Sequence, residues 1–236
     1  MRAIIVADGD RPTRVALDAT WPGWDAGVGL VVAADGGAAA AGALGLTVDV
    51  LVGDADSIAP AESERLAAAG VAVEAALVDK DETDTELALL AALRRGATEI
   101  TVLGAFGGGR LDHALANIAL LAHPSLAARS IELLDGRTRV RLLVAPGPDG
   151  GAATLALDGR VGDLVSLLPV DGDVEGVTTS GLRYPLVDEP LPLGPARGVS
   201  NVRLAAAARV TLRRGRLLVV ESTASPPRAL DPGGRP

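Results

Sequence analysis

The stretch that decides the fold is ITVLGAFGGGRLDHALANIALL, at positions 100–121. Its first seven residues are mostly apolar, several of them β-branched or Leu, which is typical of a strand buried on both faces. Three glycines follow at 107–109, and from Leu111 to Leu121 the apolar residues recur at helical spacing. The stretch therefore predicts a strand, a glycine loop and a helix, the repeating unit of an α/β sheet.

The same unit recurs through the first 135 residues. Short apolar runs, including the one just described, predict strands at 3–7, 30–34, 48–52, 71–78, 100–106 and 131–134. Helical patterns between them predict helices at 37–44, 60–69, 84–94 and 111–121. We therefore expect residues 1–135 to form a Rossmann-like, three-layer α/β domain with a mostly parallel sheet.

The hydrophobic pattern changes near residue 135, where we place a domain boundary. Short strands with turns are then expected at 139–144, 153–157, 164–169, 202–206, 210–212 and 217–221. Arg213-Arg214-Gly215-Arg216 has the composition of a hairpin turn between the last two. Residues 136–222 are thus predicted to form an antiparallel β-sandwich. Residues 223–236, rich in Pro and Gly, are predicted to be a disordered tail.

Composition limits the possible partners. A chain of 236 residues with 48% hydrophobic content can bury a substantial core. A net charge of −8 without a basic run disfavours nucleic acid, whose binding requires cations against phosphates. There is no cysteine and no apolar run near the roughly 20 residues of a membrane helix. We expect a cytoplasmic protein that binds small ligands, with no nucleic-acid or membrane partner.

Polar residues follow several of the predicted strands. Asp35 follows one, Asp54-Ala55-Asp56 another, the acidic run 79–86 a third, and the glycines at 107–109 a fourth. In open α/β sheets, ligands bind beyond the carboxyl ends of the strands, so these loops are expected to form one site. Carboxylate oxygens are the ligands of Mg²⁺, which usually also binds substrate phosphates. The pattern indicates Mg²⁺-dependent nucleotide chemistry.

The acidic run also contains the start of a helix. Thr83 and Glu86 have the spacing of a capping box, and a purely structural cap is one interpretation of this pair. Glu82 is expected to be only solvated. Asp81 and Asp84 would repel each other at the helix start unless they share a cation, which favours a metal.

These motifs together resemble those of the thiamine pyrophosphokinase family. The matching segments, in order, are 34–37 (ADGG), 53–58 (GDADSI), 80–88 (KDETDTELA), 108–117 (GGRLDHALAN), 181–186 (GLRYPL) and 198–201 (GVSN). The resemblance implies an α/β domain followed by a β-sandwich, and a homodimer with the substrate pocket at its interface. It also implies a Mg²⁺-dependent thiamine diphosphokinase that transfers pyrophosphate from ATP to the thiamine hydroxyl, giving thiamine diphosphate and AMP.

The resemblance carries site residues with it. The expected Mg²⁺ ligands are Asp54, Asp56 and Asp81. The further catalytic candidates are Asp35 and Asp84, and one carboxylate of the group is expected to orient or deprotonate the thiamine hydroxyl. The expected ATP contacts are Lys80, Thr83, Gly108, Gly109, Arg110, Asp112 and His113. The expected thiamine contacts, reached across the dimer interface, are Tyr184, Ser200 and Asn201.

Other interpretations stay open at this stage. The chain could transfer pyrophosphate to another heterocyclic alcohol such as a hydroxymethylpterin, or be a catalytically silent nucleotide-binding regulator. Asp54-Ala55-Asp56 also has the spacing of a phosphatase nucleophile. Asp8-Gly9-Asp10 is either part of the site or only a strand exit, and Tyr184 is either a thiamine contact or sandwich core. Residues 188–195 are expected to be a surface loop.

Overall fold

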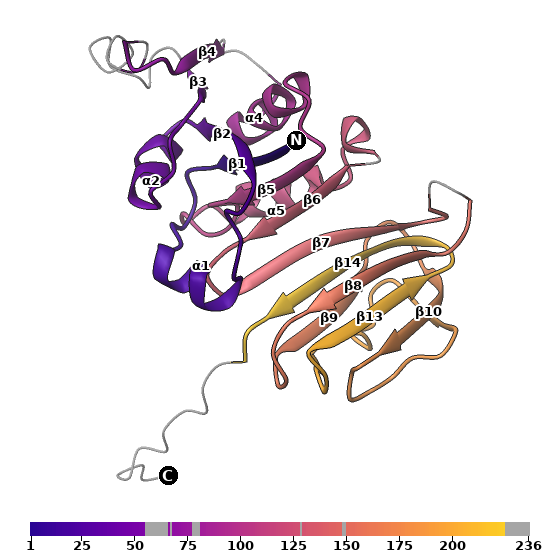
Figure 1. Ribbon diagram of the computed structural model, residues 1–236. Helices are drawn as coiled ribbons and strands as arrows, with labels where there is room; N and C mark the ends of the chain where they lie inside the picture. The colour runs from indigo at the N-terminus through magenta and orange to yellow at the C-terminus, as the bar shows by residue number, and fades with distance from the viewer. Residues whose placement is uncertain (55–65, 67, 77–80, 128, 148–149, 225–236) are drawn as a thin grey trace, which may run out of the picture. The chain divides into compact units, whose positions relative to one another are not determined.

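The computed structural model describes residues 1–54, 66, 68–76, 81–127, 129–147 and 150–224 (Figure 1). The chain divides into two compact units, Met1–Leu142 and Leu143–Pro236. Most of the predicted helix 60–69 and of the predicted tail 223–236 lies outside the described residues. Within the part that is described, no helix combines the length and apolar character needed to span a membrane.

The first unit is built on a sheet whose strands are parallel except at one edge. The strands are β1 (Arg2–Val6), β2 (Val28–Ala34), β3 (Val50–Asp54), β4 (Ala72–Ala76), β5 (Glu99–Leu103), β6 (Ser130–Leu134) and β7 (Thr138–Ala145). Their order is β7-β6-β5-β1-β2-β3-β4, and only β7 runs antiparallel to its neighbour β6. From β1 the chain builds the sheet toward β4, then returns to build β5 and β6 on the other side. The direction of sheet growth therefore reverses between β1 and β5.

Helices pack on this sheet. They are α1 (Arg14–Thr20), α2 (Gly37–Ala43), α4 (Asp84–Arg94) and α5 (Leu111–Leu120), with a short 3₁₀ helix at Pro124–Leu126. Ile4 and Val6 of β1 share one buried cluster with Leu17 of α1 and Ala40 of α2. The helix α4 contacts β1, β2 and β3. The helix α1 was not predicted, because its seven residues are too few for a helical period to stand out.

The second unit contains two sheets. Its strands are β8 (Ala153–Asp158), β9 (Leu164–Pro169), β10 (Val174–Ser180), β11 (Glu189–Leu191), β12 (Asn201–Val202), β13 (Ala207–Leu212) and β14 (Gly215–Ser222). One sheet has the order β12-β9-β14 and continues into β7, and the other has the order β11-β10-β13-β8. Pairs within β12-β9-β14 and within the four-stranded sheet are antiparallel. Both sheets bury side chains in one shared core, to which Leu167 and Val210 contribute from opposite sheets.

Several expectations for the second unit are wrong. The predicted hairpin at 213–216 does not form, because β13 pairs with β8 and β10 whereas β14 pairs with β9. The turn instead carries the chain between sheets, so that Leu212 and Leu217 both enter the shared core. Residues 202–206 mostly connect β12 to β13 rather than form a strand, and β11 lies inside the predicted loop 188–195. Turn composition alone does not show whether the next strand pairs or crosses over.

One ion pair lies inside the second unit. Arg203 donates from Nη2 to Glu221 Oε1 at 2.7 Å, with only 1% and 3% of the two side chains exposed. Nη1 of Arg203 also donates to the carbonyl oxygen of Leu157 at 2.7 Å. This buried cation therefore joins the segment after β12 to β8 and β14.

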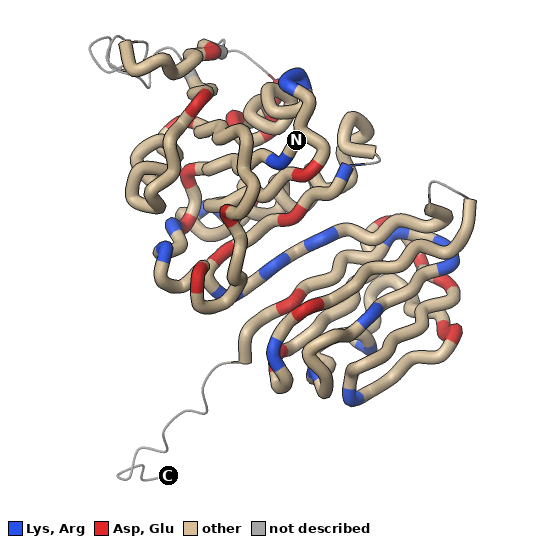
Figure 2. The backbone as a smooth tube through the Cα atoms, in the orientation of Figure 1, with Lys and Arg blue, Asp and Glu red and all other residues tan. Residues whose placement is uncertain are grey.

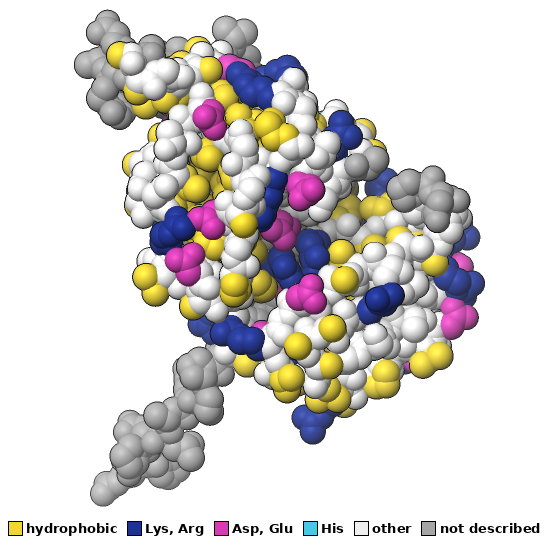
Figure 3. Space-filling view, in the orientation of Figure 1, with side chains coloured by type: hydrophobic (Ala, Val, Ile, Leu, Met, Phe, Trp, Pro, Cys, Tyr) yellow, Lys and Arg dark blue, Asp and Glu magenta, His cyan; other side chains and the backbone are white. Residues whose placement is uncertain are grey.

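Charged residues elsewhere are mixed in sign. Figure 2 shows basic and acidic residues scattered through both units, and the face in Figure 3 carries both signs. Many form exposed pairs, such as Arg213 with Asp188 and Arg216 with Asp171. Exposed pairs of this kind contribute little to stability, since water screens them.

Candidate active site

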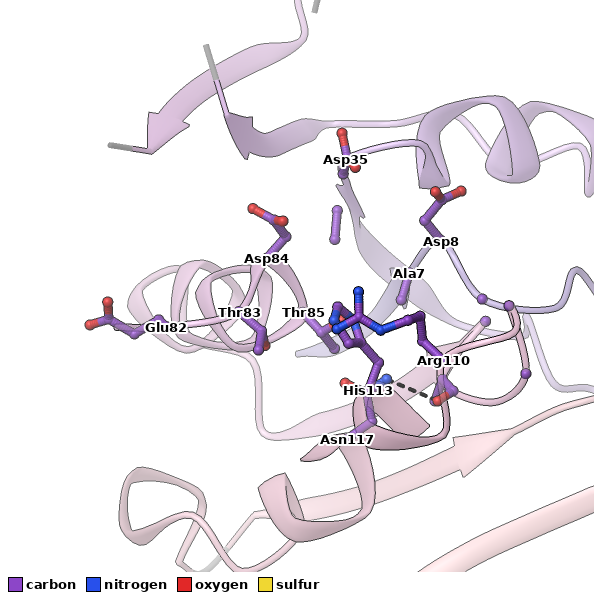
Figure 4. Close-up of a pocket in the computed structure, with 16 residues that line it drawn as sticks. Ala7, Asp8, Asp35, Glu82, Thr83, Asp84, Thr85, Arg110, His113 and Asn117 are labelled. Atoms are coloured by element: carbon purple, nitrogen blue, oxygen red, sulfur yellow. Dashed lines mark hydrogen bonds between the residues drawn. The ribbon is translucent and has the colours of Figure 1, made fainter. Parts of the chain in front are cut away.

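A pocket of about 320 Å³ lies where the strand order reverses (Figure 4). It is lined by residues that follow β1, β2 and β5, by the start of α4, and by one face of α5. The crevice beyond the carboxyl ends of strands at such a reversal is where open α/β sheets bind ligands. The topology therefore identifies this pocket as the candidate site.

The loops after β1 and β5 are joined backbone to backbone. The N–H groups of Ala7, Gly9 and Asp10 donate to the carbonyl oxygens of Leu103, Gly104 and Phe106 at 2.8, 2.9 and 2.7 Å. A Cβ on Gly9 would lie 2.3 Å from the oxygen of Gly104, so only glycine permits this approach.

Asp8 and Gly9 line the pocket, which places the Asp8 segment in the site and not merely at a strand exit. The sequence analysis left Asp8 open and did not propose it as a site residue. The usable signal was its position, because Asp8 lies two residues after β1, much as Asp35 lies one residue after β2. The pairing of β1 with β5 then brings it next to the glycine loop.

The glycine loop is left-handed throughout. Gly107, Gly108 and Gly109 have φ values of 73°, 70° and 75°, which only glycine adopts readily. Gly107 and Gly108 line the pocket, and the Gly108 N–H donates to Asp10 Oδ1 at 2.9 Å. Within the described residues, the amide N–H groups of Gly107 and Gly109 have no acceptor. Two free backbone N–H groups that flank a bonded one in a tight loop can bind an anion.

Arg110 and Asp112 bind each other beside the glycine loop. Arg110 donates from Nε and Nη2 to the two carboxylate oxygens of Asp112, at 2.9 and 2.6 Å. The guanidinium holds the pKa of Asp112 well below its usual range, and the pair raises the pKa of Arg110. Arg110 lines the pocket and Asp112 is absent from the lining, so Asp112 can act by orienting Arg110.

The first turns of α5 supply two further side chains. His113 lines the pocket from this helix. Asn117, one turn later, is buried and donates from Nδ2 to the carbonyl oxygen of Ala105 at 2.9 Å (Figure 4). Asn117 therefore fixes the loop after β5.

The start of α4 forms another wall. Thr83 Oγ1 accepts from the Glu86 N–H at 3.2 Å, which confirms the predicted cap. The Glu86 carboxylate lies 3.5 Å from His123 Nε2. Glu82, Thr83 and Asp84 all contribute to the pocket lining, but the Glu82 carboxylate points away from the other side chains of the pocket (Figure 4).

Carboxylates from three elements face the same opening. Asp8, Asp35 and Asp84 come from the ends of β1 and β2 and from the start of α4 (Figure 4). Asp35 has a φ of 48°, a conformation that is uncommon outside glycine and that concentrates at functional sites. Its N–H donates to the Val52 oxygen at 2.8 Å, which ties it to the neighbouring strand β3.

The proposed metal ligands are only partly described. Asp54 ends β3, but its side chain, Asp56 and Lys80 lie outside the described residues. Asp81 is exposed and absent from the pocket lining. Among the side chains that are described, no three acidic or His groups are close enough to form a ready-made metal cluster. The structure thus brings Asp35 and Asp84 together with Gly108, Arg110 and His113, and does not bring Asp81 or Gly109 into the lining.

The predicted thiamine contacts lie in the second unit. Tyr184 is 64% exposed, so it is not part of the sandwich core. Asn201 is buried, with Oδ1 accepting from the Tyr184 N–H at 3.0 Å and Nδ2 donating to the Tyr184 carbonyl oxygen at 2.7 Å. Ser200 has a φ of 59° and donates its N–H to Ser166 Oγ at 3.0 Å. The Asn201 side chain therefore holds the backbone beneath the Tyr184 ring.

Replacing Asn201 with Ala is expected to lower the free energy of unfolding by about 1–3 kcal/mol, because it leaves two backbone groups of Tyr184 unpaired. Asn201→Asp keeps one accepting oxygen but places a second, charged oxygen 2.7 Å from the Tyr184 carbonyl oxygen, so it should be no more stable than Asn201→Ala. Urea unfolding of the three proteins measures the order. Equal stability of Asn201→Ala and wild type would contradict this role.

Comparisons with known proteins agree with both units. The family described as "Thiamin pyrophosphokinase, catalytic domain" matches residues 26–133, and "Thiamin pyrophosphokinase, vitamin B1 binding domain" matches residues 154–217. The thiamine pyrophosphokinase of Bacillus subtilis (strain 168) is 30% identical over 171 residues, which cover 72% of this chain and 77% of that protein.

Solved structures give the same result. A crystal structure of thiamine pyrophosphokinase from Bacillus subtilis is 27% identical to this chain, with a TM-score of 0.78. The match covers 95% of this chain and 100% of that chain. A family protein from Enterococcus faecalis is 28% identical, with a TM-score of 0.77 and coverage of 95% and 100%. The chain therefore belongs to the thiamine pyrophosphokinase family.

Proposed function

We propose that this protein transfers the pyrophosphoryl group of ATP to the hydroxyl of thiamine, which yields thiamine diphosphate and AMP. The observation that carries this proposal is the pocket at the strand-order reversal, where a left-handed glycine loop, Arg110 and carboxylates converge in a chain of this family. The match to the vitamin B1 binding domain supports thiamine over a pterin alcohol.

ATP is bound through its phosphates by the glycine loop and Arg110. The Gly107 N–H offers a donor in the pocket lining and the Gly109 N–H a second one just outside it, and the planar Arg110 guanidinium can contact two phosphate oxygens at once. The two hydrogen bonds to Asp112 hold that guanidinium in one orientation before the nucleotide arrives. Thr83 at the start of α4 and His113 on α5 line the same pocket. Lys80 is a further candidate for phosphate contact.

The carboxylates fit Mg²⁺ as a partner of the nucleotide. Asp35 and Asp84 offer hard oxygen donors in one pocket, and Asp54 ends the strand beside β2. Mg²⁺ usually keeps substrate phosphates among its ligands beside one or two protein carboxylates. We propose Asp54, Asp56 and Asp81 as ligands, with Asp35 and Asp84 beside them. Bound Mg²⁺ supplies neutralisation of phosphate charge.

In the reaction, the thiamine hydroxyl oxygen forms a bond to the β-phosphorus. The bond from the β-phosphorus to the oxygen that bridges the α- and β-phosphates breaks, and AMP leaves with this oxygen. The hydroxyl proton passes to a nearby base, for which Asp35 and Asp84 are the placed candidates. The protein mainly positions the reactants and neutralises charge, as is usual in phosphoryl transfer.

Thiamine is bound by the second unit. The exposed Tyr184 ring suits stacking against the cationic ligand, and Ser200 lies in the same segment as Asn201. We propose that residues 1–135 form the Rossmann-like catalytic domain and residues 136–222 the thiamine-binding and dimerisation domain. The protein works as a cytoplasmic homodimer whose partner subunit completes each substrate pocket, as the family resemblance implies.

The test is an incubation with ATP, Mg²⁺ and thiamine, with nucleotides and thiamine esters separated by chromatography. AMP and thiamine diphosphate are expected in equal amounts. A parallel incubation replaces thiamine with a hydroxymethylpterin and should yield neither AMP nor a pterin diphosphate. ADP as the nucleotide product, or no product from thiamine, would overturn the proposal.

A further inference from the structure

We infer that Asp10 is a positioning residue for the nucleotide, because its carboxylate holds the glycine loop 107–109 in its anion-binding form. The inference deepens the proposed function and rests on it, since the loop is the proposed phosphate site. Asp10 itself does not line the pocket. It acts on the nucleotide through the loop.

The contact joins residues 98 positions apart. Asp10 Oδ1 accepts the Gly108 N–H at 2.9 Å. The same carboxylate fills the space beside Gly107, where a Cβ would lie 2.0 Å from Asp10 Cγ. Asp10 therefore touches two of the three left-handed glycines.

Such a loop needs an external support. Glycine loses more conformational freedom on folding than any other residue, so three consecutive left-handed glycines do not hold one shape unaided. Within the described residues, the Asp10 carboxylate is the one side chain that hydrogen-bonds the amide of any of the three. Without this carboxylate, the segment between Phe106 and Arg110 loses its hydrogen bond to the loop after β1.

The support is itself anchored. The Asp10 N–H donates to the Phe106 oxygen at 2.7 Å, and the Gly9 N–H donates to the Gly104 oxygen at 2.9 Å. The loops after β1 and β5 thus form one unit, with the carboxylate at its end. By taking the Gly108 N–H, Asp10 leaves the N–H groups of Gly107 and Gly109 for phosphate oxygens.

A direct role in phosphate binding is unfavourable, because a carboxylate repels a phosphate. The two roles predict opposite effects of removing the charge. If Asp10 positions the loop, the accepting oxygen matters and the charge does not. The variants Asp10→Ala and Asp10→Asn separate these properties, since Asn keeps an oxygen at the Oδ1 position.

The chain offers a matched control in Asp49. Its exposed carboxylate accepts the Val31 N–H at 2.7 Å, a bond of the same kind at the amino end of β3, away from the pocket. Asp49→Ala removes that bond and should lower the unfolding midpoint, as Asp10→Ala does. It should leave the KM for ATP within about twofold of wild type, because surface changes away from a site have small effects.

Steady-state kinetics of the four proteins tests the inference. Asp10→Ala is expected to raise the KM for ATP about tenfold, the loss expected for one charge-assisted hydrogen bond, with the KM for thiamine unchanged. Asp10→Asn should return the KM for ATP to within about threefold of wild type. A KM for ATP in Asp10→Ala equal to that of Asp49→Ala, or equal rises in both KM values, would overturn the inference.

Isothermal titration of ATP into the same proteins separates this inference from the proposed function. If wild type forms no thiamine diphosphate, the proposed function fails, yet a tenfold weaker ATP affinity in Asp10→Ala alone still supports the positioning role. If wild type is active and Asp10→Ala binds ATP as tightly as wild type, the inference fails and the function stands.

Discussion

Replacing Asp84 with Asn is expected to lower kcat/KM for thiamine diphosphate formation by roughly a thousandfold, the usual effect of removing one preorganised charge from the centre of a reaction. Asp84 is the first residue of α4, follows the Thr83 cap and faces the pocket from its acidic wall. Its carboxylate is proposed to bind the metal or to accept the thiamine proton, and an amide can do neither well.

The fold should survive this change. Asn keeps the size of the side chain, and loss of a charge near a helix N-terminus removes only about 0.3–1 kcal/mol. The unfolding midpoint of Asp84→Asn should therefore stay within a few degrees of wild type. A Mg²⁺ titration of the residual activity adds a second measurement, because a lost metal ligand raises the Mg²⁺ concentration required.

Glu99→Gln is the matched control for this experiment. Glu99 is an exposed carboxylate at the amino end of β5, whereas the pocket lies beyond the carboxyl ends of the strands. It should retain full activity and the wild-type Mg²⁺ requirement. Retention of more than a tenth of wild-type activity by Asp84→Asn would remove Asp84 from the catalytic group.

Replacing Glu221 with Ala is expected to lower the free energy of unfolding by about 3–5 kcal/mol, because it leaves the Arg203 cation buried without its partner. Both side chains are almost fully buried, and the bond between them is 2.7 Å long. Arg203 cannot lose its proton, so the uncompensated charge must stay in the core or drag its segment into water. Urea unfolding measures the difference.

Two further variants identify the cause. Asp171→Ala breaks the exposed pair with Arg216 and should change the unfolding free energy by at most about 1 kcal/mol, since water screens such pairs. The double variant Arg203→Met, Glu221→Leu should recover most of the stability, because it removes both charges and refills the space. A loss below 1 kcal/mol in Glu221→Ala would show that the pair is not needed.

Much of the first unit could be predicted from local sequence. The buried strands β1, β2 and β5 are mostly apolar, and the Thr83 cap and the α5 start have short-range signals. Each of those signals comes from residues that are close together in the chain, so it can be recognised without knowing the tertiary structure. The helix α1 and the strand β10 were missed, because each is stabilised by burial against distant elements rather than by its own pattern.

The candidate site divides in the same way. Asp35, Asp84, Gly108, Arg110 and His113 could be proposed because each follows a strand or opens a helix. The Asp8 segment could only be left as one of two options, since its contribution depends on β1 lying next to β5. The partners of Arg110 and Asn201 were likewise hidden, because a residue type does not reveal which groups its side chain will meet.

The sequence by itself determined the family, the α/β-then-β order and the residue types that nucleotide chemistry requires, since these reside in local composition and spacing. Only the tertiary structure decided which loops meet. The reversal of strand order beside β1 brings Asp10 to Gly108, and the crossing of the chain between two sheets buries Arg203 against Glu221. Those contacts arise from long-range strand pairing and core burial, which select among the many arrangements that the local sequence permits.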